Sequence, residues 1–259
     1  MKGMLNIVTY NVNGVRAALR KGFADWLKEA QPEIVCLQEI KAAKEDFDQA
    51  VFEALGYQCY LFPAQKKGYS GVAILTKIKP DAVTYGAGHP DYDSEGRNIR
   101  IDIGSLSILS AYFPSGTTGD LRQGVKMQYL DFMFGYLQEL RKSRPQLVVC
   151  GDYNICHTNI DIHDPVRNKN VSGFKPEERE WMSKYLDAGF VDSFRKIHPG
   201  LKDQYTWWSQ FANARANNKG WRIDYIAVTD NLEDRIVDAK ILPEARHSDH
   251  CPVWLSLKQ

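Results

Sequence analysis

An apolar run over residues 148–150 ends abruptly in Gly-Asp-Tyr-Asn, so that Asp152 and Asn154 stand two residues apart at the end of a predicted strand. Alternate side chains of a strand share a face, so both polar groups would point the same way where the strand ends. Either residue alone could be a turn residue or a helix cap. A buried strand that delivers both groups together predicts a functional site at the edge of a sheet.

The same arrangement recurs at other predicted strands. Three strand-like segments also end in polar residues: 5–10 before Asn11 and Asn13, 34–37 before Gln38 and Glu39, and 106–111 before Tyr112. Two runs have the reverse order, with Asp224 before residues 225–228 and Ser248, Asp249 and His250 before residues 251–255. Because one antiparallel strand starts beside the end of its neighbour, all these polar groups can line one rim.

The rim offers mainly hard oxygen donors and one imidazole. Carboxylates, carbonyls and water are the ligands that Mg²⁺ and Mn²⁺ prefer, so the rim predicts a Mg²⁺ or Mn²⁺ ion that acts on a phosphate. Zinc is the alternative, since Cys150, Cys156 and His157 lie close in sequence. The chain has no second Cys/His pair at the spacing of a zinc finger, which disfavours zinc.

The fold prediction follows from strand-like segments that outnumber helical ones. Three helices are predicted by apolar residues at helical spacing: Phe23 to Ala30, Met127 to Leu137, and Trp181 to Leu186, the last opened by Pro176 and closed by Gly189. No linker or low-complexity tract divides the chain of 259 residues. We therefore expect one domain over residues 1–259 with an α/β fold, a four-layer sandwich of two mixed β-sheets packed face to face with helices outside.

Charge and cysteine usage limit the partners and the compartment. The net charge of +1 gives no global field for nucleic acid, so DNA binding would rest on local basic groups such as Arg215, Lys219 and Arg222. The segment from Met1 passes directly into a strand without a signal peptide, and no apolar stretch approaches the length needed to span a bilayer. Five cysteines, several within apolar runs, fit a reducing compartment. We expect a soluble cytoplasmic protein with no membrane partner.

Six blocks of sequence resemble the signature blocks of the exonuclease III family of apurinic/apyrimidinic (AP) endonucleases. They cover residues 10–17 (YNVNGVRA), 37–41 (LQEIK), 68–73 (GYSGVA), 151–154 (GDYN), 220–225 (GWRIDY) and 248–252 (SDHCP). The resemblance implies a DNase I-like fold and a metal-dependent phosphodiesterase of DNA repair. Such an enzyme cuts DNA 5′ to abasic sites, and 3′–5′ exonuclease and 3′-phosphatase activities can accompany this incision. The implied partner is double-stranded DNA with abasic sites or blocked 3′ ends, and the implied state is a monomer.

The resemblance also implies roles for individual residues. The implied metal site comprises Asn11, Glu39, Asp152, Asn154, Asp249 and His250, with Glu39 as the principal ligand. The implied catalytic residues are Tyr112, Asp152, Asn154, Asp224 and His250. Asp152 would orient or deprotonate the attacking water, and Asn154 would hold a phosphate oxygen. His250, positioned by Asp224, would donate to a non-bridging oxygen as charge builds on the phosphate.

A cluster of aromatic residues near Asp224 bears on the substrate. The implied DNA-binding residues are Asn168, Lys169, Asn170, Trp207, Phe211, Trp221, Arg222 and Ile223. Trp207, Trp221 and Ile223 would form a pocket for a flipped-out baseless sugar, whose extrusion is cheap because it has lost its stacking. Phe211 would push into the duplex gap. The Asn168 to Asn170 segment and Arg222 would grip phosphates. The alternative for the aromatic residues is simple core packing, which suits Trp208.

Three positions depart from some relatives. Asn13 stands where some members have an aspartate. One fewer negative charge is then available to the metal, so that its binding depends more on Glu39. Thr118 stands near an arginine that some relatives insert into the duplex, and Ser115 stands where others have asparagine. We therefore expect the grip on the lesion and the release of product to differ from those relatives.

Other functions fit parts of this pattern. A small-molecule or lipid phosphatase of the same superfamily would share the rim but would not need the segment from Trp207 to Trp221. A secreted nuclease would be expected to carry a signal peptide and paired cysteines. A catalytically silent DNA-binding protein would have no reason to keep the rim residues together.

Overall fold

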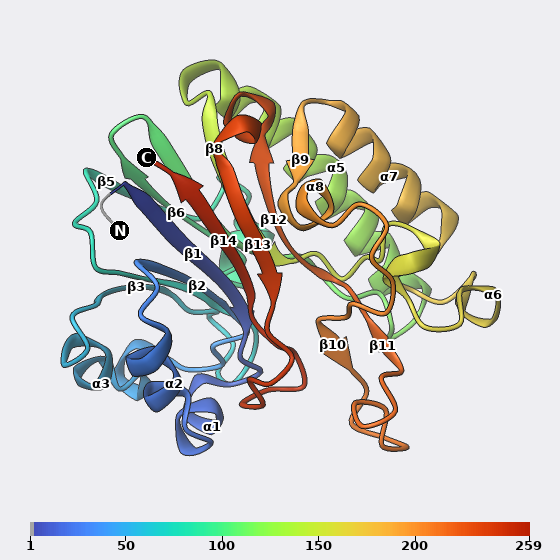
Figure 1. Cartoon of the computed structure of the whole chain (residues 1–259), viewed down its shortest axis with the longest axis horizontal. Coiled ribbons are helices and arrows are strands. Elements are labelled where there is room, and N and C mark those ends of the chain that lie inside the picture. Colours follow the sequence, from blue (N-terminus) through green and yellow to red (C-terminus); the bar gives the residue numbers. More distant parts are fainter. Residues whose placement is uncertain (1–2) are drawn as a thin grey trace.

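The computed structural model describes residues 3–259, so Met1 and Lys2, the start of the predicted N-terminal segment, lie outside the described part. Two six-stranded sheets face each other, and helices cover their outer faces (Figure 1). Both sheets are mixed, since β1 (Met4–Asn11) pairs parallel with β2 (Ile34–Gln38) and β7 (Leu106–Tyr112) pairs parallel with β8 (Gln146–Asp152), while the other pairs are antiparallel. The predicted four-layer α/β sandwich is confirmed.

The strand orders place the predicted rim segments in the centres of the two sheets. The first sheet has the order β13 (Ile236–Ile241), β14 (Val253–Lys258), β1, β2, β4 (Val72–Thr76) and β3 (Gln58–Phe62). The second sheet has the order β5 (Ala82–Tyr85), β6 (Asn98–Ile103), β7, β8, β12 (Asp224–Thr229) and β9 (Phe190–Asp192). A separate hairpin joins β10 (Trp207–Trp208) to β11 (Gly220–Trp221).

Helices lie on the outer side of each sheet (Figure 1). Beside the first sheet are α1 (Val15–Arg20), α2 (Phe23–Ala30) and α3 (Gln49–Glu53). Elsewhere are α4 (Pro90–Ser94), α5 (Asp120–Ser143), α6 (Pro165–Asn168), α7 (Pro176–Asp187) and α8 (Ser193–Ile197), of which α5 and α7 cover the second sheet. The three predicted helices are confirmed as α2, α5 and α7, and Pro176 is the first residue of α7. No helix among residues 3–259 is long and apolar enough to cross a membrane.

The alternation of side chains along β8 explains where the site lies. Val148 and Cys150 pack between the two sheets, whereas Leu147 and Val149 pack against α5 and α7. Asp152 continues the inward series at the end of the strand. The Asp152 carboxylate therefore lies at the edge of the core between the two sheets, where the packed apolar side chains end.

Gly151 is required by the close approach of β7 and β8. A Cβ atom at this position would lie 2.1 Å from the carbonyl oxygen of Ala111, its partner in the ladder. Because that oxygen belongs to a central strand, it cannot move aside cheaply. We expect Gly151→Ala to lower the free energy of unfolding by about 1–3 kcal/mol, as overpacking usually does. Urea denaturation measures the loss, and Gly135→Ala on α5, where the new Cβ meets open space, is the matched control.

Candidate active site

Strand pairing brings the predicted rim residues together. β8 runs antiparallel to β12 and parallel to β7, so that Asp224 and Tyr112 are both the direct ladder neighbours of Asp152. Across the sandwich, β1 and β2 end side by side with Asn11 opposite Gln38. The predicted convergence of strand ends is thus what the register produces.

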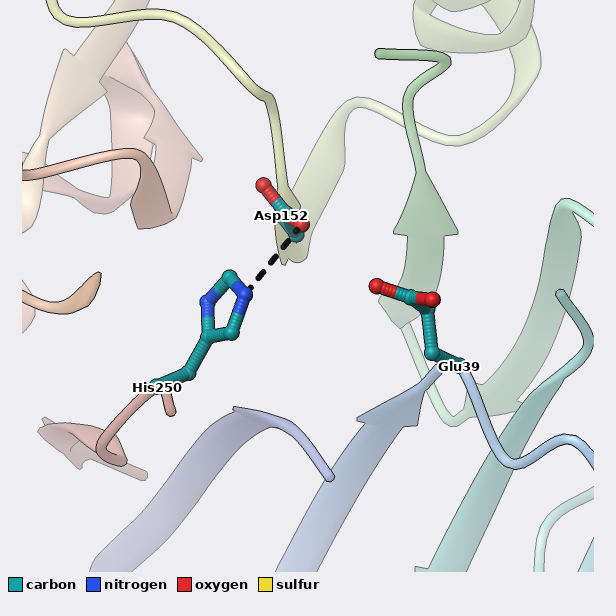
Figure 2. A group of neighbouring side chains, drawn as sticks. All are labelled: Glu39, Asp152 and His250. Atoms are coloured by element: carbon teal, nitrogen blue, oxygen red, sulfur yellow. Dashed lines mark ion pairs between the residues drawn. The ribbon is translucent and has the colours of Figure 1, made fainter. Parts of the chain in front are cut away.

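Glu39, Asp152 and His250 converge at this rim from three separate segments (Figure 2). Each offers one ligand atom, and these atoms lie within 4.8 Å of one another. Within residues 3–259, this is the only group of three or more His, Cys, Asp or Glu residues so arranged. The zinc alternative built on Cys150, Cys156 and His157 is not supported, because the two thiols are buried in the core clusters instead.

Asn11 joins the two carboxylates of this group. Its amide nitrogen donates to Oε1 of Glu39 at 2.8 Å and to Oδ2 of Asp152 at 2.9 Å. Its amide oxygen accepts from the backbone N–H of Asn13 at 3.0 Å. In this arrangement Asn11 is a hydrogen-bond bridge between two acids, and its role as a metal ligand stays a prediction.

Glu39 sits at a strained turn that follows β2. Its φ is +49°, and its Oε2 forms an ion pair of 2.9 Å with Nζ of Lys41. The Lys41 ammonium also donates to Oδ1 of Asn13, whose amide nitrogen donates to Asp249 at 2.9 Å. Asn13 therefore links the two acidic segments as a neutral group.

Asp152 is almost completely buried and fully hydrogen-bonded. Its Oδ1 accepts from the backbone N–H of Asn154 at 2.9 Å, and its Oδ2 accepts from Asn11. Burial raises the pKa of Asp152 above its ordinary value, and the neighbouring Asp224 and Glu39 carboxylates add to this rise, while His250 opposes it. A divalent cation at this point would offset the repulsion among these acids and favour the ionised form of Asp152.

His250 is held by Asp224, as predicted. Its Nδ1 donates to Oδ2 of Asp224 at 2.8 Å, which leaves Nε2 4.0 Å from Oδ2 of Asp152. Burial disfavours the charged imidazolium, but Asp224, then Asp152 and Asp249, outweigh it and raise the pKa of His250. A protonated His250 with Nε2 directed to the rim can donate to an anion.

Tyr112 lies between a cation and the acids. The guanidinium of the buried Arg97 stands 5.0 Å from the centre of its ring and donates to its carbonyl oxygen at 2.8 Å. Burial raises the pKa of Tyr112 well above its ordinary value, and Glu39 and Asp152 raise it further. The phenol therefore stays protonated and can donate a hydrogen bond.

A pocket of about 290 Å³ opens beside these groups. Its lining combines the rim with three predicted DNA-binding residues, Trp207, Trp221 and Ile223, whose rings and side chain form an apolar wall. The indole N–H of Trp207 donates to Oδ2 of Asp249 at 3.2 Å, which fixes this wall to the acidic side. Simple core packing describes Trp208, which is 3% exposed, but not Trp207 or Trp221.

The remaining predicted DNA-binding residues fall into two groups. Phe211 is 81% exposed on the loop between β10 and β11, and Lys169 and Asn170 are exposed after α6. The side-chain amide of Asn168 donates to the carbonyls of His163 and Asp164. These positions lead into residues 171–173, which line the pocket.

Arg222 requires a correction. It is 1% exposed, and its Nε pairs with Asp161 at 2.7 Å while its Nη2 pairs with Asp192 at 2.8 Å. A guanidinium buried in two ion pairs is not available to a DNA phosphate, so the predicted phosphate grip by Arg222 is wrong. Its place in the site is structural, between Trp221 and Ile223.

Two supporting residues, Lys126 and Glu178, were not predicted from the sequence. Lys126 and Glu178 form a fully buried ion pair of 2.6 Å, and Nζ of Lys126 also donates to the carbonyl of Asn154. Oε2 of Glu178 accepts the backbone N–H of Gly173 at 2.7 Å and so supports the pocket wall. The available signal was the spacing of Lys126, which lies four and seven residues before Leu130 and Met133 and so on the buried face of α5.

The comparisons with known proteins agree with this geometry. The model of the endonuclease/exonuclease/phosphatase family matches residues 8–256. The chain belongs to this family. The exodeoxyribonuclease of Bacillus subtilis is 41% identical over 252 residues, which cover 97% of this chain and 98% of that protein. The DNA repair nuclease APEX1 of Danio rerio is 39% identical over 256 residues, covering 98% of this chain and 82% of that protein.

Among solved structures, an AP endonuclease from Archaeoglobus fulgidus superposes on this member of the endonuclease/exonuclease/phosphatase family with a TM-score of 0.89. The two chains are 35% identical, and the match covers 97% of this chain and 98% of that one. The predicted family resemblance and fold class are therefore confirmed. These relatives are named as nucleases, and none of the three is a small-molecule or lipid phosphatase.

Proposed function

We propose that this chain is a metal-dependent phosphodiesterase of DNA repair that hydrolyses the backbone of double-stranded DNA 5′ to abasic sites. The observation that carries the proposal is the pocket, in which Glu39, Asp152 and His250 adjoin a wall of Trp207 and Trp221. The metal-binding and hydrogen-bonding residues of the rim alone could act on any phosphate ester. The apolar wall adds a reason to choose a nucleotide that has lost its base.

The donor set suits a hard divalent cation, for which we propose Mg²⁺ or Mn²⁺. Glu39 and Asp152 would hold it, with Asn154, Asp249 and Asn11 as the further candidates from the sequence. His250, also predicted as a ligand, has no free lone pair when it is protonated and bonded to Asp224. When bound, such an ion would neutralise charge on the phosphate and on the departing 3′ oxygen. The crowding of Asp152 with the Asp224 and Glu39 carboxylates, at the point where the ligand atoms of Glu39, Asp152 and His250 lie within 4.8 Å of one another, supports a cation at this place.

Side chains of the pocket would carry out the remaining steps of the hydrolysis. Asp152 accepts hydrogen bonds and, as the buried acid with a raised pKa, would orient the attacking water and accept its proton. His250, kept charged by Asp224, would donate from Nε2 to a non-bridging phosphate oxygen as charge builds there. Asn154 and Tyr112, which line the same pocket, would hold the other phosphate oxygens.

The substrate contacts follow from the exposed loops. Trp207, Trp221 and Ile223 would enclose the extruded sugar, and Phe211 would fill the gap that the extruded nucleotide leaves in the duplex. Lys169 and Asn170 would contact phosphates of the bound strand. The names of the relatives, an exodeoxyribonuclease and an AP endonuclease, support action on DNA, and that of a 3′ phosphatase from Neisseria bound to a product DNA hairpin, 26% identical to this chain, supports the proposed action at blocked 3′ ends. We further propose one domain over residues 1–259, a monomer and a cytoplasmic location.

The test is incubation of the purified protein with a labelled duplex that carries one abasic-site analogue, with Mg²⁺ and with EDTA. We expect Mg²⁺-dependent cutting 5′ to the analogue and much slower cutting of an undamaged duplex of the same sequence. A small phosphate ester is the third substrate. Activity on the ester without incision of the lesion would overturn the proposal and favour the phosphatase branch of the family.

A further inference from the structure

Arg215 connects two loops that border the active site. It lies half-buried in the loop of residues 209–219 that joins β10 to β11 and carries the exposed Phe211. Nη1 of its guanidinium donates to the carbonyl of Ser248 at 2.8 Å, and more weakly to that of His250 at 3.4 Å. Nη2 donates to the carbonyls of Pro243 and Ala245, both at 2.8 Å.

All four acceptors belong to the connection from β13 to β14. This connection contains the catalytic segment, which we define as Ser248 to His250. Backbone bonds fasten its far end, since Trp208 N–H donates to the carbonyl of Asp249 at 3.1 Å and Cys251 N–H donates to that of Thr206 at 2.7 Å. At the near end, from Pro243 to Ser248, Arg215 is the hydrogen-bond donor to three backbone carbonyls, those of Pro243, Ala245 and Ser248.

The chemistry of these contacts suits only a guanidinium. Its donors form a rigid planar fork, which can serve carbonyls on two sides at once, whereas a lysine ammonium is a point charge on a flexible stem. The guanidinium carbon also lies 4.5 Å from the centre of the Trp208 ring, so the fork is supported against an aromatic face. Arg215 is therefore fixed by its own surroundings before it fixes the loop.

We propose that Arg215 is a positioning residue that sets the catalytic segment, and with it Asp249 and His250, relative to Asp152 and Asp224. The same contacts fasten the loop that carries Phe211 to this segment. The inference rests on the proposed function, which it deepens by naming what aligns the site. It also gives a structural role to a residue that the sequence grouped with local basic residues for DNA binding.

The first test compares Arg215→Lys and Arg215→Met with Arg246→Met. Arg246 is the matched control because it lies in the same connection but is exposed, with its guanidinium in a loose pair of 3.8 Å with Glu244. On the abasic duplex we expect both Arg215 variants to lose kcat by about 10²-fold with KM nearly unchanged, as for a misplaced catalytic group. We also expect them to need more Mg²⁺ for half-maximal rate, because Asp249 lies on the moved segment. Arg246→Met should resemble the wild type.

Full activity in Arg215→Lys would overturn the inference, because charge rather than fork geometry would then suffice. So would a loss of kcat that disappears when the variants are assayed far below their unfolding temperatures, since that marks a role in stability alone.

The second test does not depend on activity. Hydrogen–deuterium exchange of the full chain should show faster exchange over residues 243–250 in Arg215→Met, with protection of β1 and β14 retained. Equal acceleration throughout β14 would overturn the positioning role. If the wild type fails to cut abasic DNA, the proposed function fails, and the exchange result alone then decides whether Arg215 orders the segment.

Discussion

Asp152→Asn is expected to lower kcat for incision at an abasic site by about 10³-fold, within the range that a positioned acid or base contributes. The substitution keeps the size of the side chain, and the new amide oxygen can still accept from the backbone N–H of Asn154. It removes the negative charge and the capacity to take a proton from water. The loss should appear in kcat, while binding of the uncut duplex is retained.

Single-turnover cleavage of a labelled duplex measures this effect. The matched control is Asp131→Asn on α5, where the side chain is exposed and does not line the pocket. A variant of Asp152 that keeps a rate within tenfold of the wild type would remove this residue from the centre of the mechanism.

Stability should respond in the opposite direction. Asp152 is 1% exposed and stands beside Asp224 and Glu39, so the folded protein without metal confines acids that would repel one another less in the unfolded chain. A neutral asparagine relieves part of this repulsion. We expect urea denaturation in EDTA to find the variant at least as stable as the wild type, which separates lost chemistry from lost folding.

The predicted rim was accessible from sequence because its geometry follows from two local rules. Side chains alternate between the two faces of a strand, so Asp152 lies on the same face of β8 as Val148 and Cys150. Antiparallel pairing of β8 with β12 then brings Asp224 beside Asp152. The strands and the amphipathic helices α2, α5 and α7 follow from equally local patterns. The family blocks then supplied roles that pattern alone leaves open.

What escaped prediction depends on contacts between distant segments. Asp161 and Arg222 are 61 positions apart, and nothing near either residue in sequence indicates the pairing. Arg215 bonds to backbone carbonyls, which every residue has, so its partners leave no side-chain signature. The sequence therefore grouped both arginines with basic residues available to DNA, whereas the fold buries Arg222 and half-buries Arg215.

The buried ion pairs of Asp161 give the second large prediction. Oδ1 of Asp161 is 2.7 Å from Nε of Arg222, and Arg195 pairs with the same oxygen. Asp161→Ala would leave Arg222 buried with only Asp192 as a partner. We expect the free energy of unfolding to fall by about 3–5 kcal/mol, because breaking a buried pair leaves an uncompensated charge. Asp238→Ala is the matched control, since it removes an exposed pair with Lys240 and should cost less than about 1 kcal/mol.

The pH dependence identifies the cause of this loss. Burial alone would raise the pKa of Asp161, but Arg222 and Arg195 outweigh it and hold this pKa well below its usual range. The unfolded chain therefore binds the proton first as the pH falls, so the contribution of Asp161 is complete above its unfolded pKa of about 4 and is lost below it. Urea denaturation between neutral pH and pH 3 should bring the wild type and Asp161→Ala closer together only at the acid end.

A constant difference at every pH would assign the loss to packing instead of charge. The distinction matters for the pocket, because the backbone N–H of Arg222 also donates to the carbonyl of Asp161 at 2.7 Å, between Trp221 and Ile223. If charge holds Arg222 in place, acid should loosen the wall of the pocket before it unfolds the sandwich.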